Sequence, residues 1–242
     1  MLRGMPRTVV VIPTYNETEN IARLAPVVLE HLPDAEVLVV DDDSPDGTAD
    51  VVAALGARDP RIGLLRHGPK IGIGPAYKAG FREALARQPD YVIQMDADFS
   101  HPPAMLPELV RLAAAHDLVL GSRYVNGITV VNWPIERLLL SYFGNLYVRK
   151  ILGLPVRDAT GGFKCWRRDA LRDVGVDRVR SNGYAFQIET TYRAWKHGCS
   201  LHEVPILFLD RTTGDSKMTR RIGLEALWIV WWLRTQAALR RL

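Results

Sequence analysis

Cysteine is scarce in this chain, and its two copies, Cys165 and Cys199, lie far apart with no C-x-x-C pair. Such spacing predicts neither a disulfide framework nor a zinc site, and it fits a reducing compartment best. Long apolar runs are missing too. The N-terminal "MLRGMPRTVVVIPTYNE" reaches a proline before its apolar stretch is long enough for a signal peptide, so this segment is interpreted as a first strand.

Two phosphate-binding motifs are also absent. The stretch "GIGPAY" has Gly72 and Gly74 before a proline-started helix, but Tyr77 occupies the place of the third glycine of G-x-G-x-x-G. The chain contains no G-x-x-x-x-G-K-[ST] either. A dinucleotide-dependent oxidoreductase is therefore disfavoured. The glycine loop itself is compatible with a simple tight turn and, because Lys70 stands beside it, with a nearby phosphate.

The composition is that of a globular protein. Hydrophobic residues make up 48% of the 242 residues and charged residues 24%, which excludes a disordered chain. The formal net charge of +4 and the pI near 9.2 suit partners that carry phosphate or an anionic surface. A solvated surface rich in arginine explains the same numbers equally well.

Short apolar runs alternate with helical patterns along the first half of the chain. The runs are rich in Val, Ile and Leu and too short for helices, which is typical of buried parallel strands. Their alternation with helices predicts right-handed βαβ crossovers and an α/β fold, a Rossmann-like open, mainly parallel sheet with helices on both faces. Strands are expected at residues 8–12, 36–40, 62–66, 91–95 and 117–121, and helices at 17–32, 46–58, 75–88 and 103–116.

Polar segments that follow these strands are candidate sites, because ligands of such sheets bind beyond the carboxyl ends of the strands. The four segments "PTYNE", "DDDSPDGT", "HGPKIGIGPAY" and "DADFSHPP" are expected to converge on one edge. Asp46 and Ser100 are each interpreted as a helix cap or turn residue. The run 41–43 puts three carboxylates together, which is unfavourable unless a cation or hydrogen-bond donors occupy the site.

Asp96 and Asp98 form a D-x-D at the exit of the apolar run "YVIQM". Two carboxylates around a tight turn can share a hard divalent cation through oxygen ligands and leave coordination positions open for substrate phosphates. A D-x-D alone arises often by chance, but one at a buried strand's exit beside the other polar loops is far more specific. The pattern predicts a metal that bridges the diphosphate of a sugar nucleotide.

With these motifs the chain resembles the family 2 glycosyltransferases of GT-A fold, and among them the dolichol-phosphate or polyprenol-phosphate mannose synthases. The resemblance runs from about residue 8 to about residue 220. It implies inverting transfer of mannose from GDP-mannose to a polyprenyl (dolichyl-type) monophosphate, with Mg²⁺ or Mn²⁺ as cofactor. The motifs that carry it are "VVIPTYNE", "DDDSPDGT", "GIGPAYKAGF", "MDADFSHPP", "GSRY", "DATGGFK", "FQIE" and "DRTTGDSKM".

By the same resemblance, Asp96 and Asp98 are metal ligands and the backbone of Ala97 lies against the nucleotide. Ser100 stands where some relatives have a glutamine that helps to hold the metal, so a water is expected in its place. Catalytic roles are implied for Asp98, Arg123, Arg211 and Lys217, and substrate contacts for Pro13, Tyr15, Glu17, Val40, Asp42, Lys70, Asp96, Ala97, Asp98, Arg123, Glu189, Arg211, Ser216 and Lys217.

The implied reaction needs no strong general base, because the acceptor phosphate is already anionic near neutral pH. The reaction instead requires that two phosphorylated groups be positioned and their charge neutralised. The planar guanidinium of arginine suits this task, because it binds phosphate oxygens in pairs. Glu189 in "FQIE" is therefore expected to orient the site. The alternative, an exposed position on a helix, is left open.

The C-terminal part of the chain is expected to meet a membrane. Residues 1–219 are assigned to the catalytic domain and 220–242 to a basic, Trp-rich amphipathic tail beyond it. The run 222–233 is too short to span a bilayer, which takes about 20 apolar residues. Residues 128–154 read as interfacial helices within the domain, although ordinary packing explains them equally well. We expect a peripheral protein on the cytoplasmic face of a membrane, with help from an anchoring partner protein and no nucleic-acid partner.

Three other functions stay open at this point. A polyprenyl-phosphate glucosyltransferase that uses UDP-glucose shares the same fold and metal chemistry. A transferase that builds polysaccharide on a soluble acceptor is disfavoured by the basic, Trp-rich tail. A non-catalytic nucleotide- or lipid-binding module would be expected to have lost the paired carboxylates and the basic residues, all of which are present.

Overall fold

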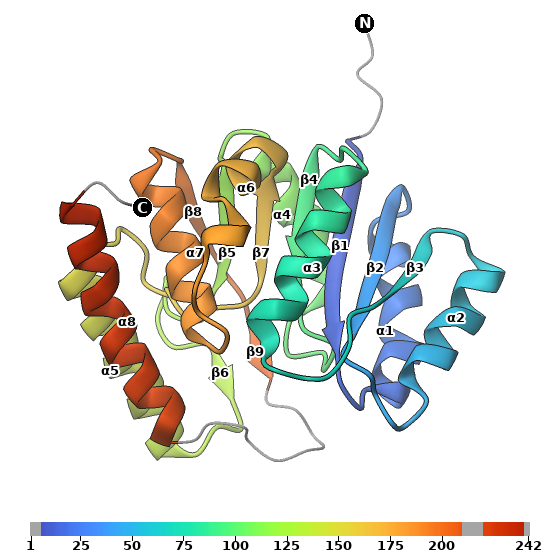
Figure 1. Ribbon diagram of the computed structural model, residues 1–242, viewed down its shortest axis with the longest axis horizontal. Helices are drawn as coiled ribbons and strands as arrows, with labels where there is room; N and C mark the ends of the chain where they lie inside the picture. Colours follow the sequence, from blue (N-terminus) through green and yellow to red (C-terminus); the bar gives the residue numbers. More distant parts are fainter. Residues whose placement is uncertain (1–5, 210–219, 240–242) are drawn as a thin grey trace, which may run out of the picture.

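The computed structural model describes residues 6–209 and 220–239, and for residues 220–227 the backbone alone. A seven-stranded sheet of order β3-β2-β1-β4-β7-β5-β8 forms its centre (Figure 1). Its strands are β1 (Thr8–Thr14), β2 (Ala35–Asp41), β3 (Ile62–Arg66), β4 (Tyr91–Gln94), β5 (Leu118–Ser122), β7 (Lys164–Arg167) and β8 (Leu201–Pro205). A separate pair joins β6 (Val130–Val131) to β9 (Phe208–Leu209).

Eight α-helices and two short 3-10 turns surround these strands in the described part of the chain. The α-helices are α1 (Thr18–His31), α2 (Thr48–Arg58), α3 (Ile73–Ala86), α4 (Leu106–Ala113), α5 (Ile135–Leu152), α6 (Arg168–Val174), α7 (Ala185–Lys196) and α8 (Arg220–Ala238), and the 3-10 turns are η1 (Pro103–Met105) and η2 (Val176–Arg178).

The sheet is mainly parallel, as the sequence predicts. Strands β1 to β4 run parallel, and so do β5 and β8. The exception is β7, which is antiparallel to both β4 and β5, so that Cys165 stands opposite Ile93 on one side and Val119 on the other. Neither β7 nor β8 is expected from the apolar runs of the sequence.

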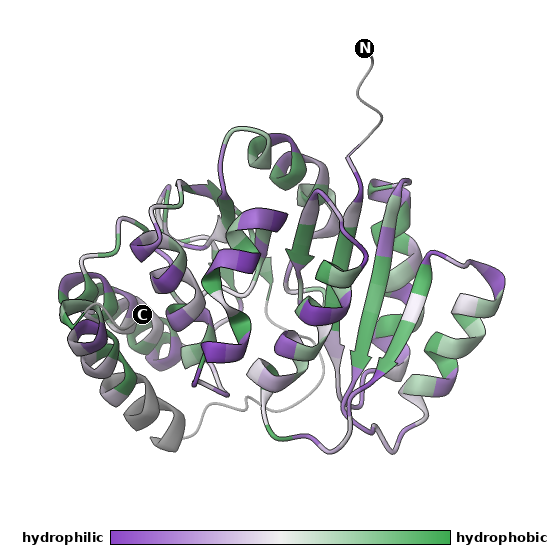
Figure 2. Cartoon of the chain, turned by 45° about the horizontal axis from the view of Figure 1, so that its top comes forward, coloured by the Kyte–Doolittle hydropathy of each residue, from purple (hydrophilic) through white to green (hydrophobic). Residues whose placement is uncertain are grey.

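Helices cover both faces of the sheet because successive side chains of each strand point to opposite sides. In β1, Val9 and Val11 belong to the core cluster shared with α3, α6 and α7, whereas Val10 and Ile12 belong to the cluster shared with α1, α2 and α4. Figure 2 shows the strands as the hydrophobic interior between these two helical layers. The predicted α/β architecture is therefore confirmed.

Helix α8 lies beside α5 at one end of the sheet and also packs on α7 (Figure 1). Ile229, Val230 and Leu233 are fully or almost fully buried and belong to the same core cluster as α7. The tail therefore does not lie beyond the domain: an apolar stripe of α8 completes the core. Within residues 6–209 and 220–239, no helix has the length and apolar character needed to cross a bilayer.

Candidate functional site

The four polar loops converge on one edge of the sheet, because β1 to β4 are parallel and all end there (Figure 1). Three of these loops contain a non-glycine residue with positive φ: Asn16 at 59°, Asp43 at 51° and Phe99 at 60°. Positive φ is unfavourable for L-residues, above all for a bulky one such as Phe99, and such strain gathers at functional sites. The backbone thus supports this edge as the site independently of the motifs.

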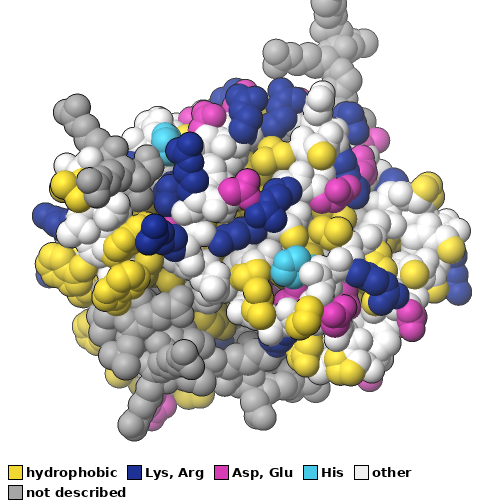
Figure 3. All heavy atoms as spheres, viewed as in Figure 1, with side chains coloured by type: hydrophobic (Ala, Val, Ile, Leu, Met, Phe, Trp, Pro, Cys, Tyr) yellow, Lys and Arg dark blue, Asp and Glu magenta, His cyan; other side chains and the backbone are white. Residues whose placement is uncertain are grey.

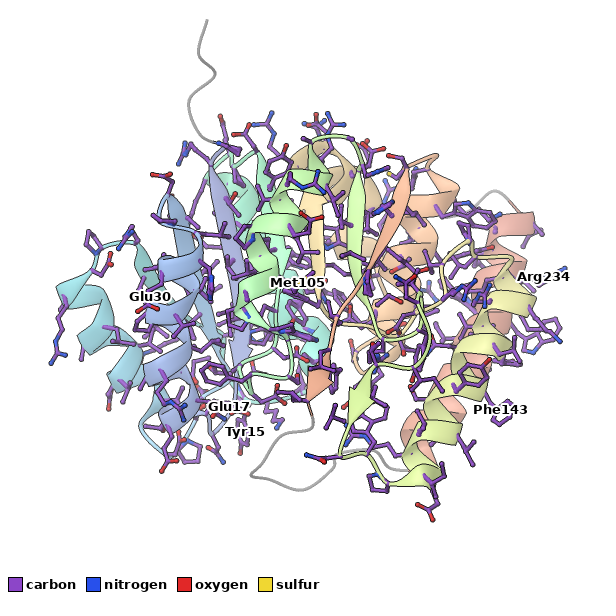
Figure 4. All side chains as sticks on the ribbon, turned by 180° about the vertical axis from the view of Figure 1, so that it is seen from behind. Tyr15, Glu17, Glu30, Met105, Phe143 and Arg234 are labelled. Atoms are coloured by element: carbon purple, nitrogen blue, oxygen red, sulfur yellow. The ribbon has the colours of Figure 1, made fainter. Side chains whose placement is uncertain are left out.

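Tyr15 and Lys70 come together at this edge from the loops after β1 and β3. The ammonium of Lys70 lies 3.9 Å from the centre of the Tyr15 ring. His67 Nδ1 lies 2.8 Å from Asp42 Oδ1, within hydrogen-bond distance. Burial raises the pKa of Asp42, although the hydrogen bond and charge of His67 act in the opposite direction. Glu17 lies beside Tyr15 at the same edge (Figure 4). The contact between Lys70 and Tyr15 confirms the predicted convergence of these two loops.

Pro13 and Val40 belong to the strands themselves. Pro13 lies in β1 opposite Val40 in β2, and Pro13 is partly exposed. The side chain of Val40 is fully buried, and a methyl group on Gly80 of α3 would come within 2.9 Å of it. Any contact of Val40 with a substrate would therefore run through its backbone, and its role as a substrate contact stays a prediction.

Asp41, the last residue of β2, and Asp46, in the loop after it, hold the loops together. Asp41 accepts hydrogen bonds from the Thr14 hydroxyl at 3.0 Å and from the Ser44 hydroxyl at 2.6 Å. Asp46 accepts from the backbone N–H groups of Thr18 and Thr48, at the start of α1 and α2. Slight burial of Asp46 acts in the opposite direction, but these hydrogen bonds lower its pKa to about 2. Asp46 precedes Gly47, the N-cap residue of α2, so of the two interpretations the structure supports the turn residue.

The two carboxylates of the D-x-D are held by different neighbours. Tyr77 donates its hydroxyl to Asp96 Oδ1 at 2.9 Å, and its buried ring stacks on Phe186 of α7 with centroids 5.9 Å apart. Burial and the charge of Asp96 raise the pKa of Tyr77 well above its usual value, so the hydroxyl keeps its proton. Asp98 Oδ1 accepts from both the backbone N–H and the hydroxyl of Ser100, at 3.1 and 2.6 Å.

The residues around Asp96 fit a hard cation. Its Oδ2 lies 3.9 Å from His101 Nε2, beyond hydrogen-bond distance, and a third of the side chain is exposed. The neighbouring Gly162 keeps this oxygen accessible, because a methyl group there would lie 3.6 Å from it. No group of three or more His, Cys, Asp or Glu that could hold a metal ion occurs in the described ranges. A cation held by Asp96 and Asp98 would therefore complete its shell with substrate oxygens or water.

Arg123 is engaged by a carboxylate of the protein. Its Nε and Nη2 each lie 2.7 Å from an oxygen of Asp158, and its backbone N–H donates to the same carboxylate. Burial alone would raise the pKa of Asp158, but the charge and hydrogen bonds of Arg123 outweigh it and lower that pKa. In this structure the guanidinium of Arg123 therefore links the end of β5 to the "DATGG" segment. Its catalytic role stays a prediction.

Glu189 is not an exposed helix residue, because its side chain is completely buried. Its carboxylate accepts hydrogen bonds from the backbone N–H groups of Arg180 and Ser181 and forms an ion pair with Arg193 at 3.0 Å. The segment 180–182 in turn packs against the glycine loop, where Asn182 O accepts from the backbone N–H of Gly74 at 2.8 Å. Glu189 therefore positions this loop, in line with an orienting role, and does not reach the site itself.

The glycines of "GIGPAY" have a packing reason. A Cβ at Gly72 would lie 2.6 Å from Asn182 O, and one at Gly74 would lie 2.8 Å from Ser181 O. Only glycine allows the two backbones to approach this closely.

Arg211, Ser216 and Lys217 lie outside the described residues, so their predicted roles stay predictions.

Lys164, the last residue of the "DATGGFK" motif, is fully buried, and the sequence alone predicts no role for it. Its Nζ donates to the backbone oxygen of Gln187 at 2.9 Å and to Gln187 Oε1 at 2.8 Å. Burial lowers the pKa of Lys164 from 10.5 to about 7, and the charge of Asp158 offsets part of this effect.

The lowered pKa of Lys164 predicts a pH dependence of stability. Between the folded pKa of about 7 and the unfolded pKa of 10.5, the unfolded chain binds a proton that the folded chain lacks, so stability rises with pH. The slope reaches at most about 1.4 kcal/mol per pH unit. Urea unfolding of the wild type and of Lys164→Met across this range measures it. As pH rises, the free energy of unfolding of the wild type should increase relative to that of Lys164→Met. A difference between the two that does not change with pH would contradict the lowered pKa of Lys164.

Comparison with known proteins places the chain among sugar transferases. The model of "Glycosyl transferase family 2" matches residues 9–175. The undecaprenyl-phosphate mannosyltransferase of Micrococcus luteus is 44% identical over 221 residues, which are 91% of either chain. The polyprenol monophosphomannose synthase of Mycolicibacterium smegmatis is 44% identical over 237 residues, which are 96% of this chain and 89% of the relative.

Solved structures of lower identity share the fold. The glucosyl-3-phosphoglycerate synthase of M. tuberculosis is 19% identical, with a TM-score of 0.64 over 97% of this chain and 81% of that one. The same enzyme in complex with Mn²⁺, uridine diphosphate and glucosyl-3-phosphoglycerate has a TM-score of 0.63, covering 98% of this chain and 80% of that one. Identity this low supports the fold alone.

Proposed function

Because the chain belongs to glycosyl transferase family 2, we propose that it is an inverting mannosyltransferase that moves mannose from GDP-mannose to a polyprenyl monophosphate. Its fold is the GT-A fold expected from the sequence. The observation that carries the proposal is the 44% identity, over about nine-tenths of both chains, to two relatives named for mannosyl transfer to undecaprenyl phosphate or for polyprenol monophosphomannose synthesis. The products are polyprenyl-phosphate mannose and GDP.

The residues at the sheet edge support this chemistry. Tyr15, Glu17 and Lys70, which lie together at this edge, are proposed to contact the nucleoside diphosphate. Asp96 and Asp98 are proposed to hold Mg²⁺ or Mn²⁺ at the diphosphate. When bound, the cation neutralises the charge that develops on the leaving diphosphate. The acceptor phosphate attacks as an anion, so the protein's task is to position it. The inward-turned carboxylate of Glu189 agrees with a reaction that requires no general base.

A donor screen with the purified protein tests the proposal. GDP-mannose and UDP-glucose are each offered with a short-chain polyprenyl phosphate and Mg²⁺ or Mn²⁺, and the lipid product is identified by mass spectrometry. We expect mannosyl product from GDP-mannose, a β-linked sugar by NMR, and no product in EDTA. Glucosyl product from UDP-glucose alone would favour the alternative donor. Nucleotide binding without any transfer would favour a binding module.

Tyr77 gives a separate test of the cation site, because it fixes the orientation of Asp96. Groups that orient metal ligands typically contribute about 10–100-fold to metal affinity. Tyr77→Phe keeps the ring and its stacking on Phe186, so Mn²⁺ affinity should fall by that factor while the melting temperature changes little. Electron paramagnetic resonance of unbound Mn²⁺ in the presence of GDP measures it. Tyr192→Phe, at a buried tyrosine that packs on Trp195, is the matched control. Equal affinities in the two variants would contradict the role of Tyr77.

A membrane contact is proposed for the end of the molecule formed by α5 and α8. Apolar side chains gather at this end in Figure 3, and Phe143 projects outward from α5 in Figure 4. Large rings at a water–lipid boundary and arginines beside them favour a membrane interface. We further propose that the protein acts at the cytoplasmic face and that an anchoring partner protein assists it. Among the side chains that the structure describes, the exposed large apolar residues of the two helices are Ile135, Leu139, Leu140, Tyr142 and Phe143 on α5 and Trp228 and Trp231 on α8.

Liposome co-sedimentation tests this surface. Removing α8 would uncover the buried Ile229 and Leu233, so exposed residues are changed instead. We expect Phe143→Ser combined with Trp231→Ser to weaken binding to anionic vesicles at least about tenfold, since each large side chain buries apolar area worth roughly 1.5–3 kcal/mol when fully covered. Turnover of a short water-soluble acceptor should change little. Unchanged vesicle binding by the double variant would move the contact elsewhere.

A further inference from the structure

The motif "FQIE" places two polar residues on different sides of α7. Residues two positions apart on an α-helix are separated by about 200° around its axis. Glu189 faces segment 180–181, as described above, whereas Gln187 faces the strands of the sheet, where it meets Gln94 of β4 and Lys164 of β7. Gln187 is 3% exposed.

The amide of Gln187 has a fixed orientation. Trp166 can only donate, and its Nε1 lies 3.4 Å from Gln94 Oε1, so Gln94 turns its NH₂ group toward Gln187. Gln94 Nε2 then donates to Gln187 Oε1 at 2.5 Å, and Lys164 Nζ donates to the same oxygen at 2.8 Å. With its oxygen held by two donors, Gln187 must direct Nε2 to the other side.

That other side is the space beside the D-x-D. A methyl group built on Gly162 would lie 3.5 Å from Gln187 Nε2, 3.6 Å from Asp96 Oδ2 and 3.3 Å from His101 Cε1. The three side chains therefore surround one small space that is open because residue 162 is glycine. No hydrogen bond joins Gln187 Nε2 to Asp96 among the hydrogen bonds of residues 6–209.

We propose that Gln187 Nε2 donates a hydrogen bond to a phosphoryl oxygen of a bound substrate. The inference rests on the proposed function, which supplies two phosphorylated groups, the diphosphate of the donor and the monophosphate of the acceptor. A neutral amide suits this place because Asp96 already supplies one carboxylate there and a second would repel an anionic oxygen further, whereas an N–H attracts it. The two donors on Oε1 polarise the amide and strengthen its N–H as a donor.

Gln187→Glu is the most direct variant. It has the same size and keeps an oxygen for Gln94 and Lys164, but it replaces the N–H donor by a negative oxygen. We expect kcat/KM to fall about 10- to 100-fold, as for loss of a hydrogen bond to a charged group, with the melting temperature unchanged or raised. If Gln187 served only to accept from Lys164, the variant would keep wild-type kinetics, and that result would overturn the proposal.

Gly162→Ala fills the same space without a change at Gln187. The backbone of Gly162 lies outside the left-handed region and the new contacts would be 3.3–3.6 Å, so the fold should accept the methyl group. Gly161→Ala is the matched control, because its Cβ would meet Gly121 O at 3.3 Å and Asp158 at 3.4 Å, in a similarly crowded place. We expect a loss of kcat/KM comparable to that of Gln187→Glu in Gly162→Ala alone.

Titration calorimetry identifies whose phosphate is bound, and it does not depend on turnover. Each variant is titrated with GDP and Mn²⁺, and then with geranyl phosphate in the presence of both. A fall in GDP affinity of tenfold or more in Gln187→Glu and Gly162→Ala assigns the contact to the donor, and a fall for geranyl phosphate assigns it to the acceptor. Wild-type affinity for both ligands in both variants would overturn the proposal. Failure of the wild type to use GDP-mannose would instead count against the proposed function alone.

Discussion

Replacing Asp98 by asparagine should lower kcat/KM roughly 10²–10³-fold or more, because the leaving diphosphate loses much of its charge neutralisation. The fold should tolerate the change. Asparagine keeps an oxygen at Oδ1, where the Ser100 hydroxyl and backbone N–H donate. Steady-state kinetics at several Mg²⁺ and Mn²⁺ concentrations, with a thermal melt of each variant, provide the measurement.

Asp43→Asn is the matched control for this experiment. Asp43 is an exposed carboxylate in the neighbouring loop, and asparagine tolerates its φ of 51°. Both variants lose one negative charge at the same edge of the sheet, so a general electrostatic effect would lower their activities alike. Activity of Asp98→Asn near the wild-type level, or wild-type turnover that persists in EDTA, would rule out the carboxylate pair as the cation site.

The second large effect is expected on stability, at Asp158. Asp158→Asn leaves the Arg123 guanidinium buried without its counter-charge, and loss of one partner of a buried ion pair costs about 3–5 kcal/mol. For a chain of this size that corresponds to a melting temperature lower by roughly 6–20 °C. Differential scanning calorimetry and urea unfolding, read by circular dichroism, measure both quantities.

Two comparisons separate this effect from a general loss of charge. Asp177→Asn removes the partner of Arg82 in an exposed ion pair, where both side chains are more than half exposed, and should hardly shift the melting temperature. A double variant, Arg123→Met with Asp158→Leu, removes both charges and should recover much of the lost stability. A similar loss in the single and the double variant would show that packing, and not the unpaired charge, dominates.

The sequence predicts the strands that have continuous apolar runs, most of which are buried on both faces. The five runs correspond to β1 to β5, each displaced by at most two residues. It does not predict β7, "KCWR", or β8, "LHEVP", because short strands that carry Lys, Arg, His or Glu lack both the apolar run and a clear alternation. The antiparallel insertion of β7 depends on pairing across the whole chain, which no local pattern encodes.

The same limit applies to the site. The D-x-D and its converging loops follow from the motifs and from parallel topology, but contacts between distant residues do not. Arg123 and Asp158 are 35 residues apart, and nothing local indicates that they pair. Helix α7 is buried on nearly all sides, so its pattern could not indicate whether Gln187 or Glu189 faces the site. One signal was visible: Tyr77, in place of a third glycine, is the residue that holds Asp96.

The tail shows how one composition can serve two environments. Its composition predicts a membrane interface beyond the domain for the whole helix, yet Val230 and Leu233 complete the core while Trp228 and Trp231 stay exposed. Both surfaces need apolar side chains, so composition alone could not divide the helix between them.

The position of β7 also has a consequence for the order in which the chain can fold during synthesis. Strands β1 to β4 lie within residues 8–94 and pair with one another, so half of the sheet can form as soon as they have left the ribosome. Strand β5 is made next, but both of its neighbours, β7 and β8, are made later. Until residues 164–167 emerge, the nascent chain presents an open edge at β4 and an unpaired apolar strand at β5, the two features that most favour aggregation or chaperone binding. The four residues of β7 are therefore made late, yet they connect the part of the sheet formed by β1 to β4 with the part formed by β5 and β8.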